Sequence, residues 1–230
     1  MSRHLGVVAV IALCLAAGSG RAQSAPTGPC ASGPTLYAAG QLKPAFRVFM
    51  TCAIAGDSAS QYSAAMMMRS GESNDDGSPN WFGSRVFLEQ AASQGYAEAI
   101  YALAKEYDVG SPAFQRDLNR ATELFRQAAL QGHVDAQVDL ATQYLLGRGG
   151  VPQDDGVAAQ WYERAAEAGH WGAQFLIASM YEHGYGVSRN VVAALRWYER
   201  AKDGGDELAP LKAYQLRLHV ATKTRQLRLD

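Results

Sequence analysis

The stretch from Ala158 to Asn190, AAQWYERAAEAGHWGAQFLIASMYEHGYGVSRN, can be laid over the chain before and after it at an almost fixed spacing. Within this stretch Gly169 marks the end of a predicted helix, and its equivalents are Gly56, Gly95, Gly132 and Gly205. Successive glycines are separated by 39, 37, 37 and 36 residues. Self-similarity at a period of this length is the sequence signature of a repeat protein built from supersecondary units.

Each unit is predicted to contain two helices. Fifteen residues before the last four glycines stand side chains that favour helix N-caps, because they accept a hydrogen bond from the first turn: Asn80, Asp117, Asp154 and Asn190. The first unit has Gln41 there, which is a weaker cap. Small residues follow the cap at four and eleven positions and a large one at eight, as in Ala194, Ala201 and Tyr198. The helix after the glycine carries small, Leu-like and aromatic residues in turn, such as Ala173, Ile177 and Tyr181. One pair cannot bury these faces alone, so the units must stack.

Two glycine loops, residues 147–151 and 184–187, each precede a cap and a helix with the sequence WYERA, at 161–165 and 197–201. This combination resembles the Sel1-like repeats, which are relatives of the tetratricopeptide repeats. The resemblance runs from about Leu36 to Lys202. It implies an all-α fold, an α-solenoid of antiparallel helix pairs, with four to five units in residues 41–205 that form a single domain.

Residues 1–22 are predicted to be a secretory signal peptide. Arg3 and His4 precede an apolar run from Leu5 to Ala17, and a polar stretch follows. The run is shorter than the roughly 20 residues of a membrane-spanning helix, so we expect cleavage after Ala22. An uncleaved anchor is the alternative. The mature chain is expected to be periplasmic or secreted, with no stable membrane insertion.

Cleavage leaves two cysteines, Cys30 and Cys52, which is an even number in an oxidising compartment. Cys52 occupies the small-residue position that later units fill with alanine: Ala91, Ala128 and Ala165. We expect a disulfide that fixes an irregular segment, residues 23–40, to the first helix pair. Two unpaired buried thiols are the alternative.

Residues 206–230 are expected to form a C-terminal capping helix, because a repeat array needs a polar cap on its exposed end. The segment carries five cations: Lys212, Arg217, Lys223, Arg225 and Arg228. We expect its large apolar residues to face inward: Leu208, Leu211, Tyr214 and Leu218. The alternative is a basic docking site for an acidic partner or an anionic lipid.

Little in the sequence indicates catalysis. His133 and His170 follow the helix-ending glycine in equivalent positions, as features of the repeat do, and His183 beside Glu182 lacks the spacing of a His-Glu-x-x-His zinc site. No Gly-x-Ser-x-Gly elbow or Ser-x-x-Lys motif is present. Without Arg3 and Arg21 the formal charge goes from −1 to −3, which is no nucleic-acid signature. We expect a monomer that is not an enzyme and that binds no cofactor, no metal and no nucleic acid.

The resemblance to tetratricopeptide arrays implies a concave groove lined by one helix of each unit. Matching the helix pattern to those arrays places these residues on or near the groove: Tyr62, Met66, Arg69, Glu98, Tyr101, Lys105, Asp108, Asp135, Val138, Thr142, Phe175, Ser179, Glu182 and His183. Aromatic side chains beside charged ones suit a protein partner, because Tyr and Arg are enriched among residues that dominate binding energy. In the alternative interpretation, Tyr62, Tyr101 and Phe175 merely pack between helices.

Within the family, the resemblance implies three roles for exported members: inhibitors of sensor kinases, immunity proteins that block secreted phospholipase-type toxins, and envelope scaffolds. We expect an inhibitor or immunity protein that holds a protein partner in the groove. The alternative from another class is a binder of a cell-wall or β-lactam-related ligand, or an envelope enzyme. That class requires titrating groups that converge in a pocket.

Overall fold

The computed structural model describes residues 28–226. The predicted signal peptide and the first five residues of the segment 23–40 lie outside this range. The described chain forms two compact units, one that ends at His133 and one that begins at Val134.

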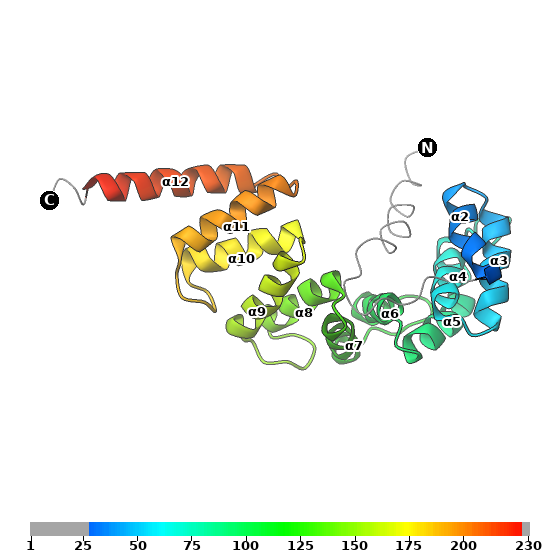
Figure 1. The fold of residues 1–230 in the computed structure, drawn as a ribbon. Coiled ribbons are helices and arrows are strands. Elements are labelled where there is room, and N and C mark those ends of the chain that lie inside the picture. The colour runs from blue at the N-terminus through cyan, green and yellow to red at the C-terminus, as the bar shows by residue number, and fades with distance from the viewer. Residues whose placement is uncertain (1–27, 227–230) are drawn as a thin grey trace. The chain divides into compact units, whose positions relative to one another are not determined.

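Both units consist of α-helices joined by turns and loops (Figure 1). The first unit contains the 3₁₀ helix η1 (Gly28–Ala31) and helices α2 (Ser32–Ala38), α3 (Leu42–Ile54), α4 (Ser58–Ser70), α5 (Trp81–Ser93), α6 (Ala97–Val109) and α7 (Leu118–Leu130). The second contains α8 (Val134–Leu146), α9 (Asp155–Glu167), α10 (Trp171–His183), α11 (Val191–Asp203) and α12 (Ala209–Gln226). Residues 28–226 include no strand, and Ser111 and Phe114 form an isolated bridge. None of the described helices is long and apolar enough to cross a membrane. The predicted all-α fold of packed helix pairs is confirmed.

The predicted caps start the helices as expected. Asp117 Oδ1 accepts from Arg120 N at 3.0 Å at the start of α7, and Asn190 Oδ1 accepts from Ala193 N at 3.0 Å at the start of α11. Gln41, before α3, makes no such side-chain bond. The turn between α9 and α10 uses Gly169 at a φ of 94°, a conformation that side chains with a Cβ rarely adopt.

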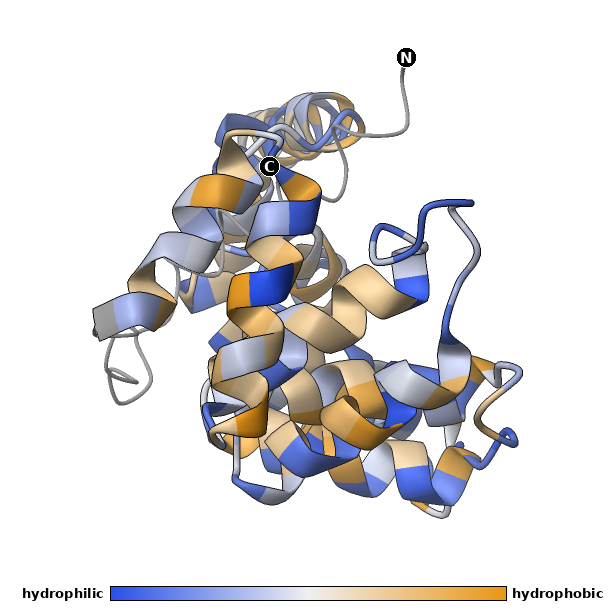
Figure 2. Cartoon of the chain, turned by 90° about the vertical axis from the view of Figure 1, so that its right-hand side faces the viewer, coloured by the Kyte–Doolittle hydropathy of each residue, from blue (hydrophilic) through white to orange (hydrophobic). Residues whose placement is uncertain are grey.

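Small residues allow the helices of a pair to approach closely, as the spacing predicts. In α11, Ala194 and Ala201 are fully buried on either side of Tyr198, which is buried too. In α10, Ala173 and Ile177 are likewise buried. Figure 2 shows hydrophobic and hydrophilic segments alternating along the helices, as this one-sided burial requires.

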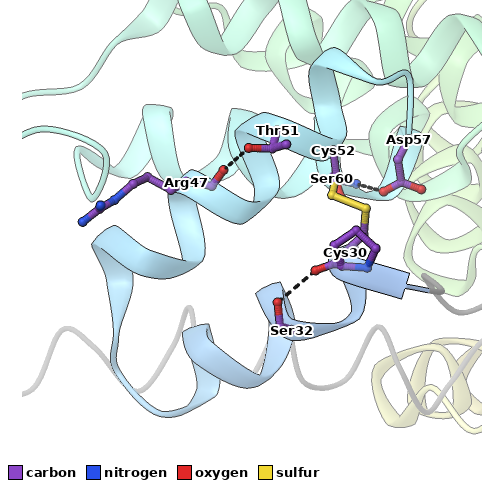
Figure 3. The surroundings of a disulfide bond; sticks show 8 residues. Cys30, Ser32, Arg47, Thr51, Cys52, Asp57 and Ser60 are labelled. Carbon is purple, nitrogen blue, oxygen red and sulfur yellow. Dashed lines mark hydrogen bonds between the residues drawn. A yellow bond between two sulfur atoms is a disulfide. The ribbon is translucent and has the colours of Figure 1, made fainter.

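The prediction of an irregular segment before residue 41 is wrong, because the chain is helical from Gly28 to Ala38. Tyr37 of α2 is buried in a cluster with Phe49 of α3, and this contact stabilises a helix that has no strong local signal. A Cβ on Gly33 would lie 2.6 Å from the Phe49 ring, so the glycine lets α2 approach α3. The predicted disulfide is confirmed: it joins Cys30 of η1 to Cys52 of α3 (Figure 3), with the Cα atoms 5.9 Å apart.

The prediction that the large apolar residues of the capping helix face inward is also wrong. Leu208, Leu211, Tyr214 and Leu218 are all exposed, whereas Ala209, Ala213 and Leu216 are buried against α11. Ala209 and Ala213 stand 36 residues after Ala173 and Ile177, so α12 keeps the repeat's close-packing face. The large residues are therefore left on the opposite face of the helix.

Candidate functional site

In the first unit the predicted binding residues lie on α4 and α6, and an ion pair links the two helices. Arg69 Nη1 of α4 lies 2.8 Å from Glu106 Oε1 of α6. The Glu106 side chain is 4% exposed, while that of Arg69 is 42% exposed. A buried carboxylate is costly without its cation, so this pair fixes the C-terminal half of α4 beside α6. Met66, one turn earlier on α4, is half-buried.

A second cluster surrounds Tyr101 of α6. Its ring stacks on His133 with the centroids 4.3 Å apart, and it lies 5.9 Å from the ring of Phe125 in α7. Lys105 Nζ lies 5.8 Å from the centroid of the same Phe125 ring. Tyr101 and Lys105 are half-buried. The cluster thus packs between helices and also presents part of its surface to solvent.

The remaining predicted residues of the first unit differ in exposure. Tyr62 is only 8% exposed and its ring lies 5.6 Å from that of Tyr96, so it supports the packing that the alternative interpretation proposed. Glu98 and Asp108 are half-buried at the two ends of α6. The backbone carbonyl of Asp108 accepts a hydrogen bond from Arg116 Nε at 2.9 Å, which fixes the loop after α6.

In the second unit, the residues predicted on α8 make contacts with the following helices. Asp135 Oδ1 lies 3.6 Å from Nε2 of His170, which caps α10 through its Nδ1. The hydroxyls of Thr142 and Tyr162 are 2.8 Å apart, which joins α8 to α9. Val138 packs on the apolar core of this pair and is half-buried. Asp135 is the exposed member of the group.

On α10 the predicted residues converge on Tyr198 of α11. The Tyr198 hydroxyl donates to Glu182 Oε2 at 2.7 Å, and the Phe175 ring meets the Tyr198 ring edge-on at 5.3 Å. His183 Nδ1 lies 2.8 Å from the carbonyl oxygen of Ser179. Phe175, Ser179 and Glu182 are half-buried, and His183 is exposed.

The ionisation of the tyrosines follows from these contacts. Burial raises the pKa of Tyr198 well above its usual range, and the hydrogen bond to Glu182 adds to the shift. Burial likewise raises the pKa of Tyr162 and of Tyr181, whose hydroxyl donates to Glu163 Oε1 at 2.9 Å. These phenols stay protonated at neutral pH and act as hydrogen-bond donors that join helices.

Two further features bear on ligand binding. Within residues 28–226, no three His, Cys, Asp or Glu side chains are grouped as metal ligands would be. A cleft of about 510 Å³ lies between α3 and α5, and it is lined by residues that include Ile54, Gln61, Val86 and Gln94. In it, Gln94 Nε2 donates to Gln61 Oε1 at 2.7 Å. None of the predicted binding residues lines this cleft.

Sequence reasoning missed Glu106, which anchors Arg69. Its equivalents in the other units are Met67, Gln143 and Met180, all buried. The signal is an acidic residue at a repeat position that the other units fill with buried uncharged residues. A buried acid of this kind indicates a specific cation partner on a neighbouring helix.

Most of the helices that carry the predicted binding residues match a known repeat family. A family model of the Sel1 repeat matches residues 97–133, 134–170 and 171–206. Residues 97–206 therefore consist of three Sel1 repeats. The three matches start at the first residues of α6, α8 and α10, so the predicted binding residues between Glu98 and His183 lie on the first helix of a Sel1 repeat. Those on α4 precede the matched region.

Solved structures agree with this assignment. The chain is similar to a Sel1 repeat protein from Oxalobacter formigenes, with 29% identity and a TM-score of 0.70 over 76% of this chain and 49% of that protein. It is also similar to a protective antigen of uropathogenic Escherichia coli strains that displays an SLR fold, with 27% identity and a TM-score of 0.66 over 71% of this chain and 34% of that protein. This Sel1 repeat chain thus spans about half and about a third of those two proteins.

The chain also matches an immunity protein of Pseudomonas aeruginosa over 94% of this chain and 81% of that protein, with 15% identity and a TM-score of 0.46. No curated protein matches the sequence. The Sel1 repeat is a protein-interaction fold, and the geometry described above is suited to binding: half-buried rings, a methionine and charged side chains on helices fixed by buried contacts.

Proposed function

We propose that this Sel1 repeat protein is a non-enzymatic, exported protein-interaction module that binds a protein partner along its first helices. The binding residues are those that the sequence predicted on α4, α6, α8 and α10. Of these, Arg69 in the first unit and Asp135 and His183 in the second are exposed, and Met66 and Lys105 are half-buried.

One observation carries this proposal: the ion pair between exposed Arg69 and buried Glu106 holds α4 and α6 together, and both helices expose part of the proposed binding residues. A rigid surface loses little conformational entropy when a partner binds. Arg, Met and aromatic side chains are also enriched in the cores of protein interfaces. The first unit therefore offers a preorganised face of the composition that protein partners select.

The partner class that we propose is a secreted effector, such as a phospholipase-type toxin, which the chain inhibits as an immunity protein. A stoichiometric inhibitor must keep its binding face intact outside the cytoplasm. The disulfide at the N-terminal end of the described first unit and the ion pair of Arg69 with buried Glu106 both serve that requirement. A sensor kinase is the second partner class to which the same face would be suited.

The disulfide also supports export. Cys52 is buried and bonded to Cys30, and structural disulfides form and persist in oxidising compartments. The predicted signal peptide, which lies outside the described residues, would deliver the chain there.

The proposal is tested by an affinity pull-down from periplasmic extract with the chain from Gln23 onward, followed by mass spectrometry. Met66→Glu places a charge on the proposed face, and Val86→Glu is the matched control because Val86 is a 52% exposed residue of α5 in the same unit. We expect one protein to be retained by the native chain and the control and to be lost with Met66→Glu. Circular dichroism checks that both variants stay folded.

Equal retention by both variants would contradict the assignment of the face. If neither the native chain nor either variant retains a protein, a cell-wall or small-molecule ligand would be favoured instead.

A further inference from the structure

The outward face of α12 is an apolar surface that the other described residues leave exposed. Leu211, Tyr214 and Leu218 are 57%, 60% and 50% exposed, and they recur at three- and four-residue intervals on one side of the helix. Ala209 and Leu216 on the other side are buried against α11. A contiguous exposed apolar stripe on an otherwise packed helix marks an interaction site.

The repeat register shows that this face is built to meet a helix. Leu211, Tyr214 and Leu218 stand 36 residues after Phe175, Ala178 and Glu182 of α10. Those three residues contact the next helix, α11. The ring of Phe175 packs on Tyr198, Glu182 accepts the Tyr198 hydrogen bond, and Ala178 belongs to the same buried cluster. The equivalent face of α12 is therefore the one that a following helix covers.

Tyr214 defines what kind of helix fits there. The four equivalent positions hold fully buried alanines: Ala65, Ala104, Ala141 and Ala178. The large Tyr198 of α11 belongs to the same buried cluster as the small Ala178. A helix like α11 would collide with Tyr214, so the helix that docks on α12 must carry a small residue at that point.

Charge defines the flanks of the docking helix. Residues 209–226 hold four cations and no acid: Lys212, Arg217, Lys223 and Arg225. Lys212 lies 3.9 Å from Glu182, and Arg217 forms an ion pair with Glu199, so the protein already balances the first half of this helix with acids from α10 and α11. A second copy of α12 would bring two such helices together, which like charges oppose. Acidic flanks on the incoming helix complement the excess positive charge.

We propose that the outward face of α12 binds an acidic amphipathic helix of a partner protein, with a small residue of that helix seated on Tyr214. The face lies on the second unit and involves none of the residues proposed above as the binding face of the first helices. Binding at α12 is therefore independent of that function, and each proposal can fail without the other.

A display library of 20-residue helical peptides tests the proposal. Flank positions vary among Glu, Lys and Gln, and the central position varies among Gly, Ala, Leu and Phe. The library is selected on the full chain and on the Leu211→Ser, Leu218→Ser variant. Val192→Ser is the matched control, since Val192 is a 59% exposed residue of α11 in the same unit. All three replaced residues are exposed, so the variants should fold as the native chain does, which circular dichroism checks.

We expect the enriched peptides to be acidic and to have Gly or Ala at the centre. They should bind the double variant at least 10-fold more weakly than they bind the native chain and the control. Tyr214→Ala should shift the preferred central residue towards Leu or Phe. A non-specific hydrophobic surface would not show this change of specificity.

Three outcomes would overturn the proposal. The first is a selection without the expected specificity: either basic and acidic peptides are enriched alike, or the native chain enriches peptides no more than the double variant does. The second is sedimentation of the chain with phosphatidylglycerol vesicles that depends on Leu218 in the absence of peptide binding, which assigns the face to a membrane. The third is a dimer in analytical ultracentrifugation that the double variant abolishes, which assigns it to a second copy.

Discussion

The first described helices, α2 and α3, and the last one, α12, differ in how much apolar surface they leave exposed. At the start, α2 buries Tyr37 against α3, and the Cys30–Cys52 disulfide closes the contact covalently. At the end, α12 buries two alanines and Leu216 and leaves its large apolar residues exposed. A closed edge protects a fold from further association, whereas an open apolar edge remains available for a partner. Of these two ends, the one formed by α12 is therefore the one whose apolar surface remains open to a partner.

The long loop after α4 reinforces the closed edge. Glu72 accepts a hydrogen bond from the Tyr37 hydroxyl at 3.1 Å, and Asp75 forms an ion pair with Lys43. This loop thus contacts both α2, through Glu72, and α3, through Asp75. The corresponding contacts of α12 are the ion pairs of Lys212 and Arg217, which are on the surface.

Breaking the disulfide should have the largest effect. The Cys30→Ala, Cys52→Ala variant is expected to lose about 3 kcal/mol of unfolding free energy, because the 22-residue sequence separation no longer constrains the unfolded chain. Urea denaturation measures the loss, with the reduced native protein as a second test. A change below about 0.5 kcal/mol would show that Tyr37 and Phe49 alone hold the edge closed.

Truncating the two faces of α12 separates its buried side from its open one. Leu216→Ala should cost about 2 kcal/mol, the low end for a buried leucine because a terminal helix can relax around the cavity. Leu218→Ala should change stability by less than about 0.5 kcal/mol. Thermal unfolding of the pair compares them directly. Equal losses would mean that the exposed face of α12 is covered in solution.

Removing one hydroxyl tests the link from α10 to α11. Tyr198→Phe keeps the packed ring and loses the hydrogen bond to Glu182, which should cost about 1 kcal/mol. The raised pKa of Tyr198 means that the folded state holds the proton more tightly than the unfolded state. Stability should therefore fall as pH rises above about 10, where the unfolded tyrosine ionises.

The fall in stability above that pH should be shallower in Tyr198→Phe than in the native chain, measured by denaturation from pH 8 to 11. An identical slope in both proteins would exclude Tyr198 from the alkaline transition.

Exposed ion pairs should have the smallest effect. Arg217→Gln removes the pair with Glu199 on the surface of the second unit, and we expect a loss of about 0.5 kcal/mol or less that vanishes in high salt. Denaturation at low and high ionic strength measures it. A salt-independent loss of 1 kcal/mol or more would indicate that Arg217 also packs α12 onto α11.

The repeat register predicted most of the fold because it combines local signals that agree with the packing. The caps at Asp117 and Asn190 and the small residues around Tyr198 each specify a helix, its start and its buried face. A fold can be predicted from its sequence where local helix signals, the hydrophobic pattern and the tertiary packing all agree.

Both errors concern α2 and α12, the first and last α-helices of the described residues. Helix α2 has no cap hydrogen bond and no acid in its first turn, so only tertiary contact with Phe49 reveals it. In α12, size suggested that Leu211 and Tyr214 face inward, but Ala209 and Ala213 take the close-packed side. Large residues are buried when space exists for them, and that space cannot be read from one helix.

For the candidate binding face, the sequence predicted the helices that carry its residues but not the contacts that those residues make. The register placed Tyr101 and Phe175 on helices that the structure contains, α6 and α10, and their half-buried rings also contact neighbouring helices. The sequence could not show that Arg69 forms an ion pair with Glu106, because these residues lie 37 positions apart on different helices. Long-range pairs depend on the stacking geometry and carry no local signal.

Photo-crosslinking in the periplasm tests the proposed binding face most directly. A photoreactive amino acid replaces Met66 on α4, and in a matched chain it replaces Val86 on α5. We predict one discrete adduct with a single protein from position 66 and none from position 86. Adducts from position 86 alone, or the same adducts from both positions, would contradict the claim that the first helices of this Sel1 repeat protein hold its partner.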